Sequence, residues 1–327
     1  MSILVTGAGV IGSHTARILA ESGESVVLMD LEPALDSIAS IVDSDKVSIV
    51  QGDIVDYEGL STLVTERGVE AIVHTAAMLS RAIRGQPRRG VMVNVIGVTN
   101  MLEVAREQNL RRVVLASSGT VGYPTFDSFR GETFPEDFSM RVLSERPNTL
   151  YSVTKLAGEH IALFYQQEYG TDAVILRYGA VLSAWRGETK NTPGKMLADL
   201  LGPAIAGKSA VIDDPMTVWG GNEEFVDARD CAAGNVAALF ADDPKSRVYN
   251  LSCGQAHTYM QIVDAVCELY PSLKVDIQVP LEGGMAGLTV ERPAPSDISL
   301  AKSELGYAPA YTLQESIQHF ATVMSGS

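Results

Sequence analysis

Short apolar runs alternate with segments of helical periodicity through the first half of the chain. Each run has the length of one strand and is rich in Val, Ile and Leu, whereas residues 57–67 and 91–109 repeat apolar side chains at helical spacing. This alternation predicts an α/β fold with a Rossmann-type, doubly wound parallel sheet. The predicted strands are residues 3–5, 25–29, 47–50, 71–74, 112–116 and 173–178.

The pattern becomes less regular after residue 178. Residues 182–221 contain several Gly and Pro breaks, which predict a loop-rich segment that covers the substrate and ends in a strand near 209–212. The later predicted elements are a helix that starts near Asp227, a strand at 248–251 and helices at 259–270 and 312–324.

A length of 327 residues allows about two domains. The regular first half and the irregular second half suggest where they divide. We expect a Rossmann domain at residues 1–178, to which residues 223–251 return. The remaining residues, 179–222 and 252–327, are expected to form a smaller C-terminal lobe that binds the substrate.

Composition and charge narrow the function classes. Hydrophobic residues at 46% and charged residues at 20% indicate a folded protein, and the net charge of -15 argues against general binding to nucleic acid. No apolar run reaches the length of a membrane span, and Met1 leads directly into the first strand, so we expect a soluble cytoplasmic protein. Cys231, Cys253 and Cys267 have no metal-binding spacing and an odd count, which predicts neither a metal site nor a disulfide framework.

The turn after the first strand carries a dinucleotide-binding pattern. Gly7, Gly9 and Gly12 are spaced G-x-G-x-x-G between a strand and a helix, where a tight turn and close backbone approach would place a pyrophosphate at the helix N-terminus. Asp30 ends the next strand, at the distance expected for a carboxylate that binds the adenosine ribose. No arginine follows Asp30 to bind a 2′-phosphate, so NAD is favoured over NADP.

Tyr151 and Lys155 are four residues apart at the predicted start of a helix. At this spacing both side chains leave the same helix face. We expect the lysine ammonium to lower the pKa of the phenol from its usual value near ~10, so that the phenolate could accept a proton from an alcohol. The pair therefore suggests a redox site.

Six ordered motifs together resemble the extended short-chain dehydrogenase/reductase superfamily, which includes nucleotide-sugar epimerases and dehydratases. The resemblance covers nearly the whole chain. The motifs are Gly7-x-Gly9-x-x-Gly12, Gly52-Asp53-Ile54, His74-Thr75-Ala76-Ala77, Asn94 to Asn100, Ser117 to Val121 and Tyr151-x-x-x-Lys155.

This resemblance implies an NAD-dependent enzyme in which Ser118, Tyr151 and Lys155 form the catalytic trio. Ser118 would hydrogen-bond the substrate oxygen, and Ser80 and Thr120 would face the substrate. Asn94 and Asn100 are expected to hold a helix to its neighbouring loop. The residues implied to contact NAD are Gly7, Gly9, Val10, Ile11, Gly12, Asp30, Asp53, Ile54, Ala76, Tyr151 and Lys155.

Several positions depart from the nucleotide-sugar enzymes. Gly179-Ala180 stands where those enzymes usually have an aromatic residue and an asparagine, and Glu223 replaces an arginine that would bind a diphosphate. Arg292 remains where the family often contacts diphosphate, but it could equally anchor a carboxylate or form a structural ion pair. The Ser118-Gly119-Thr120 segment lacks the carboxylate of the dehydratases, so dehydration is not expected.

Four arginines follow the His74 motif, in a region that faces substrate in this superfamily: Arg81, Arg84, Arg88 and Arg89. In a chain of charge -15 they suggest an anion site, although solvated surface arginines would give the same pattern. Residues 77–80 are also similar to the matching loop of short-chain L-threonine dehydrogenases, which suggests a compact substrate. Met216 and Trp219 could line the pocket, although packing is the commoner role of such residues.

These observations predict an NAD-dependent oxidoreductase that oxidises a secondary alcohol on a sugar-like or hydroxy-acid substrate. A UDP-sugar 4-epimerase of the UDP-glucose type, with tightly bound NAD, remains an alternative because it would use the same trio. A binding protein that senses NAD without turnover is a third possibility. The expected partners are a small-molecule substrate and a second copy of the chain, because helices near 91–109 and 151–169 commonly form a dimer in this superfamily.

Overall fold

The computed structural model describes residues 1–43, 45–185 and 191–326. Its centre is a seven-stranded parallel sheet with the strand order β10-β6-β5-β4-β1-β2-β3. This order reverses direction at β1, which confirms the predicted doubly wound sheet. The strands are β1 (Ser2–Thr6), β2 (Ser25–Asp30), β3 (Val47–Gln51), β4 (Ala71–His74), β5 (Arg112–Ser118), β6 (Ala173–Tyr178) and β10 (Val248–Leu251).

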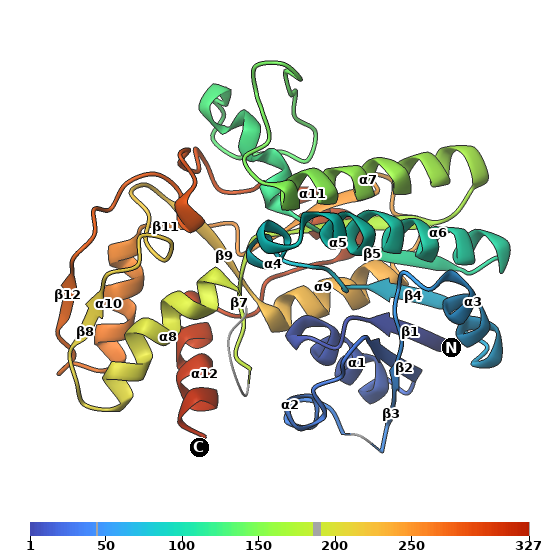
Figure 1. Cartoon of the computed structure of the whole chain (residues 1–327), viewed down its shortest axis with the longest axis horizontal. Coiled ribbons are helices and arrows are strands. Elements are labelled where there is room, and N and C mark those ends of the chain that lie inside the picture. Colours follow the sequence, from blue (N-terminus) through green and yellow to red (C-terminus); the bar gives the residue numbers. More distant parts are fainter. Residues whose placement is uncertain (44, 186–190, 327) are drawn as a thin grey trace.

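Helices cover both faces of this sheet because its strands are apolar on both sides (Figure 1). In β1, Ile3 and Val5 pack into one hydrophobic cluster and Leu4 into another. The first cluster includes side chains of α1 (Val10–Glu21), α9 (Ala228–Phe240) and α11 (Ser299–Leu305). The second includes side chains of α3 (Tyr57–Glu66), α6 (Gly97–Glu107) and α7 (Leu150–Tyr169).

A third hydrophobic cluster lies in the lobe at the left of Figure 1. It joins the helices α8 (Thr192–Ile205), α10 (Tyr259–Leu269) and α12 (Leu313–Ser325). Two small sheets accompany them, one of β8 (Ala210–Ile212) and β12 (Val275–Ile277), the other of β7 (Ala180–Leu182), β9 (Glu223–Asp227) and β11 (Ala256–His257). Trp219 is 1% exposed in this cluster, so it is a packing residue.

The loop-rich prediction for residues 182–221 is wrong over α8. Pro193 and Gly194 were interpreted as breaks, but they lie in the first turn, where proline is tolerated because its missing N–H has no helical partner. The Asn191 side chain caps this turn by accepting the Gly194 N–H at 2.9 Å. Apolar side chains then recur at helical spacing and are buried in the lobe: Met196, Leu197, Leu200, Leu201 and Ala204.

Short helical segments complete the described fold. They are α2 (Leu35–Ala39), α4 (Ser80–Gly85), α5 (Pro87–Val91), a π-helical stretch at Met92–Ile96 and 3₁₀ segments at Gly119–Ser128 and Met285–Gly287. Within the described ranges, no helix has the length and apolar character needed to cross a bilayer. Residues 186–190 of the predicted covering segment lie outside the described residues.

Candidate active site

The glycine turn between β1 and α1 has the geometry that its spacing predicts. Gly7 has φ +87°, and a Cβ atom there would lie 2.6 Å from the Ala76 nitrogen. A Cβ at Gly12 would lie 1.9 Å from the Gly7 carbonyl oxygen, so the helix can approach the turn only with glycine here. At Gly9, by contrast, no described atom lies within 4 Å of that position, and α1 has no side-chain cap in the described chain. This N-terminus therefore leaves room and amide donors for an anion.

Asp30 lies against the same turn. Its Oδ2 atom accepts the Ala8 N–H at 2.8 Å, and its Oδ1 atom accepts the Glu32 N–H at 3.0 Å. The carboxylate is thus held between the end of β2 and the glycine turn, where the residues fit the ribose of a dinucleotide.

The loop after β3 forms the next part of this edge. Asp53 Oδ1 accepts the Val55 N–H at 2.9 Å, and Asp53 Oδ2 accepts a hydrogen bond from Arg89 at 2.9 Å. Ile54 is buried against Gly97, where a Cβ would lie 2.6 Å from Ile54 Cδ1. The fold therefore brings Asp53 and Ile54 to the same carboxyl edge of the sheet as Gly7 and Asp30.

Two asparagines connect helical segments to neighbouring loops through hydrogen bonds to the backbone. Asn94 accepts the Met78 N–H at 2.8 Å and donates to the Met78 carbonyl at 3.0 Å. Asn100 donates to the Ile54 carbonyl at 2.9 Å. These bonds confirm the predicted structural role of both residues.

The predicted trio comes together where β5 meets α7. Ser118 ends β5 and accepts hydrogen bonds from the Thr120 N–H at 3.3 Å and the Thr120 hydroxyl at 3.0 Å. Tyr151 and Lys155 lie in the first turns of α7, and the Lys155 Nζ atom is 5.8 Å from the centroid of the Tyr151 ring. Lys155 Nζ donates to the Ala116 carbonyl at 2.7 Å.

The expected lowering of the Tyr151 pKa is wrong for this structure. Burial raises the pKa of Tyr151 to about 12, and the Ser118 hydroxyl opposes this only in part. Burial also lowers the pKa of Lys155 to about 8, against the attraction of the Glu159 carboxylate. The Lys155 ammonium donates to the Ala116 carbonyl, and the pKa of Tyr151 is set by burial and the Ser118 hydroxyl.

A buried network behind the trio was not predicted. Glu159 lies one helical turn beyond Lys155 and forms an ion pair with Arg177 at 2.6 Å between Oε2 and Nη2. The Ser117 hydroxyl also donates to Glu159. The i, i+4 spacing of Lys155 and Glu159 could have suggested that their charges interact, whereas the contact with Arg177 depends on the pairing of β5 and β6.

Arg292 forms buried ion pairs, one of the three roles left open by its position. Its Nε atom lies 3.0 Å from Glu223 Oε1, and its Nη1 atom lies 3.1 Å from Glu224 Oε2. The three side chains are between 0% and 4% exposed. Although burial alone would lower the pKa of Arg292, the two carboxylates raise it above its usual value. Glu223 therefore neutralises this arginine.

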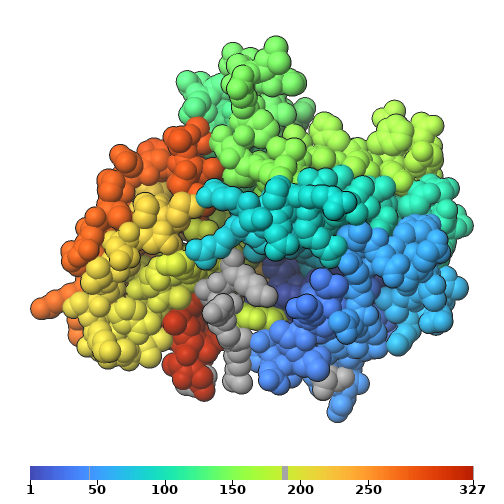
Figure 2. All heavy atoms as spheres, viewed as in Figure 1, coloured from blue at the N-terminus to red at the C-terminus, as the bar shows by residue number. Residues whose placement is uncertain are grey.

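The arginine-rich segment forms α4 and α5 above the cleft. Arg81, Arg84 and Arg88 are exposed and make no ion pair with any described residue, whereas Arg89 pairs with Asp53. A cavity of about 450 Å³ is lined by residues 86–89 and Met92. Figure 2 shows the surface hollowed between this part of the chain, in cyan, and the blue N-terminal residues.

The sheet order, glycine turn and Ser-Tyr-Lys site together define an NAD-dependent enzyme of the extended short-chain dehydrogenase/reductase type. The chain belongs to the NAD dependent epimerase/dehydratase family, whose model matches residues 3–252. This membership confirms the predicted family, the NAD cofactor and the enzyme class.

Relatives within the family differ in the reactions that their names give. The chain is 28% identical to a UDP-glucose 4-epimerase of Halalkalibacterium halodurans, over 98% of this chain and 94% of the relative. Among solved structures, an L-threonine dehydrogenase from Cupriavidus necator matches with a TM-score of 0.81 and 25% identity, covering 98% of this chain and 99% of that one. A Thermus thermophilus UDP-glucose 4-epimerase in complex with NAD matches with a TM-score of 0.78 and 26% identity over 100% of both chains.

Proposed function

We propose that this protein oxidises a secondary alcohol on a compact sugar-like or hydroxy-acid substrate that carries no nucleoside diphosphate. The convergence of Ser118, Tyr151 and Lys155 carries the proposal, because these groups suit proton removal from an alcohol and lie in a fold whose glycine turn fits a dinucleotide.

NAD, when bound, accepts the hydride from the carbinol carbon. The Tyr151 phenolate accepts the proton of the substrate hydroxyl, and Ser118 hydrogen-bonds the same oxygen. Burial raises the pKa of Tyr151 to about 12, so its anion needs stabilisation by the Lys155 ammonium and the Ser118 hydroxyl. Lys155 can provide this while it is protonated, and its own pKa of about 8 sets an upper pH limit.

We assign the cofactor to the edge formed by the glycine turn, β2 and β3. The amides around Gly9, Val10 and Ile11 would hold the pyrophosphate, and Asp30 would hold the adenosine ribose. Asp53 and Ile54 would flank the adenine, and Ala76 would line the nicotinamide side.

The two ion pairs of Arg292 support a substrate without a diphosphate. Since Glu223 and Glu224 already neutralise this buried cation, a diphosphate would have to compete with two carboxylates for it. Thr120, which donates to Ser118, and Ser80, which begins α4, are proposed to face the substrate.

Arg81 and Arg84 on α4 pair with no carboxylate among the described residues, and their charge favours an anionic group on the substrate. We expect Arg81→Ala to raise the KM for an anionic substrate about 3- to 10-fold, since it removes one partly solvated charge contact, and to leave NAD affinity unchanged. Steady-state kinetics with matched anionic and neutral substrates would measure this effect. An identical KM in the variant and wild type would contradict substrate binding by Arg81.

UDP-sugar epimerisation is the second candidate, supported by the names of the epimerase relatives. The two reactions differ in whether NADH is released. Incubation of the protein and NAD with sugar acids, aldoses, hydroxy amino acids and UDP-sugars would separate them. Net NADH from a compact alcohol supports the proposal, whereas an epimerised UDP-sugar with no net NADH contradicts it. A catalytically silent NAD sensor would give neither product.

We further propose how the chain is divided and assembled. Residues 1–178 and 223–251 would bind NAD, and residues 179–222 and 252–327 would bind the substrate, although β9 pairs with β7 and β11 instead of the central sheet. A homodimer through the α6 and α7 helices and a cytoplasmic location fit this assignment. Exposed apolar side chains on α7, including Val153 and Phe164, support the dimer.

A further inference from the structure

The position of Asp53 follows from strand register. Asp30 pairs with Gln51 across β2 and β3, so Asp53 lies two residues beyond the end of the adjoining strand. Asp30 already accepts a hydrogen bond from the Ala8 N–H in the glycine turn. Asp53 therefore lies farther from the glycine turn along the carboxyl edge, on the adenosine side of the cleft.

Arg89 reaches this edge from the opposite wall. It lies on α5, and its Nη2 atom is 2.9 Å from Asp53 Oδ2, while the other Asp53 oxygen is held by the Val55 N–H. Burial acts to raise the pKa of Asp53, but the Val55 amide and the Arg89 guanidinium outweigh it and hold the pKa below its usual value. The side chains of Arg89 and Asp53 are 36% and 30% exposed. Since a pair this exposed contributes little to stability, fold stability alone does not account for it.

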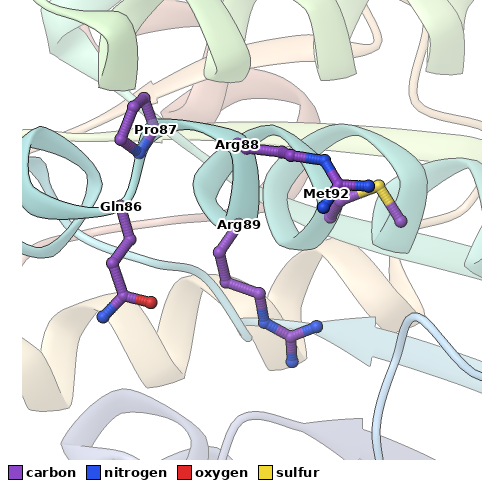
Figure 3. A pocket seen from close by; sticks show the side chains of 5 residues that line it. All are labelled: Gln86, Pro87, Arg88, Arg89 and Met92. Atoms are coloured by element: carbon purple, nitrogen blue, oxygen red, sulfur yellow. The ribbon is translucent and has the colours of Figure 1, made fainter.

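Arg89 also lines the open cavity of about 450 Å³ on α5, whereas Asp53 does not. Figure 3 shows Arg89 and Gln86 extending from the helix to the same side, whereas Arg88 runs along the helix towards Met92. The guanidinium of Arg89 therefore contacts both this open surface and the Asp53 carboxylate at the edge of the sheet.

We propose that Arg89 is a cofactor-binding residue and that the Arg89–Asp53 ion pair forms the outer wall of the adenine subsite. A planar guanidinium binds well to an aromatic face, and adenine presents such a face. Because Asp53 already orients the guanidinium, little side-chain freedom would be lost on binding. The inference concerns NAD binding alone and needs no assumption about the substrate.

Calorimetric titration of the full chain with NAD, ADP-ribose and nicotinamide mononucleotide tests this assignment. We expect Arg89→Ala to weaken NAD and ADP-ribose by about 3- to 30-fold, the range of a cation–aromatic contact. Nicotinamide mononucleotide, which lacks adenosine, should bind as it does to wild type. The matched control is Arg88→Ala, which removes the same charge from the same cavity wall without an ion pair and should change NAD affinity less than twofold.

Four outcomes would overturn the assignment. Unchanged NAD affinity in a folded Arg89→Ala protein would make the pair purely structural. If Arg88→Ala weakened NAD binding as much as Arg89→Ala does, general charge attraction would explain the effect. If Arg89→Ala weakened nicotinamide mononucleotide as much as NAD, the variant would have a distorted site. Arg89→Lys keeps the charge but loses the planar face, so full retention of NAD affinity in that variant would also contradict the proposal. Since no substrate is added, none of these results depends on the proposed reaction.

Discussion

At the scale of single residues, two opposing electrostatic effects act on the pKa of Lys155. Burial lowers its pKa to about 8, while Glu159 favours its charged form. Its hydrogen bond to the Ala116 carbonyl places the ammonium beside the Tyr151 ring instead of on the phenol oxygen. In the proposed reaction, proton transfer at Tyr151 would therefore depend on a lysine that is itself close to losing its charge at moderately alkaline pH.

His74 is a second buried base at this edge. Burial lowers its pKa to about 3, and its Nδ1 atom lies 2.6 Å from the Thr6 hydroxyl oxygen. Its Nε2 atom is buried and has no hydrogen-bond partner among the described residues. Protonation of the ring would therefore place an unpaired charge in the interior.

Stability should consequently fall as pH drops below 6.5. The unfolded chain binds a proton at His74 near pH ~6.5, but the folded chain does not until about pH 3, so acid favours unfolding by on the order of 2 kcal/mol by pH ~5. Urea unfolding across this pH range would measure the slope. We expect His74→Asn to lower the slope of the unfolding free energy against pH by about one bound proton. His160→Gln, at an exposed histidine on α7, should lower this slope less. Equal slopes in both variants would contradict this interpretation.

At the scale of elements, periodicity and local spacing were sufficient for most of the Rossmann half. The strands, the glycine turn and the start of α7 depend on residues close in sequence, and the structure contains them where they are predicted. Helix α8 was missed because Pro193 and Gly194 resemble breaks unless Asn191 is recognised as the cap.

Contacts between distant elements could not be predicted in the same way. Arg292 is 69 residues from Glu223, and Arg89 is 36 residues from Asp53, so neither ion pair leaves a periodic signal in the sequence. The predicted drop in the Tyr151 pKa failed for a related reason. Spacing identifies a neighbouring charge, but the burial that outweighs it is a property of the folded site.

Arg292 should hold β9 to the C-terminal segment. Arg292→Met would leave Glu223 and Glu224 buried without their cation, so we expect a loss of about 3–5 kcal/mol in the free energy of unfolding. Arg146→Met, at an exposed position, is the control and should change stability by less than about 0.5 kcal/mol. Urea unfolding would compare them, and similar midpoints for both variants would refute the structural role.

At the scale of the whole molecule, α7 connects the proposed catalytic site to the proposed dimer surface. Tyr151 and Lys155 lie near its start, while Val153, His160 and Phe164 form an exposed stripe at helical spacing. Phe164 is 53% exposed and Val153 is 38% exposed, so a second copy of the chain on this face would cover apolar surface.

We expect a dimer of about 70 kDa, twice the chain mass of 35.0 kDa, by light scattering. Phe164→Asp would place a charge on the apolar surface and should give a monomer. Leu143→Asp alters a residue that is 88% exposed on a loop outside α7, and it should remain dimeric. A wild-type monomer, or a Phe164→Asp dimer of unchanged stability, would rule out this interface.

Tyr151 is proposed to remove the substrate proton while hydride is transferred to NAD. NADH formation by wild type and Tyr151→Phe, with the alcohol identified in the substrate screen, tests it directly. We predict a loss of about 10²- to 10⁴-fold in rate with NAD affinity within threefold of wild type, because only the proton acceptor is removed. A Tyr151→Phe protein that forms NADH at a rate within threefold of wild type would contradict the claim.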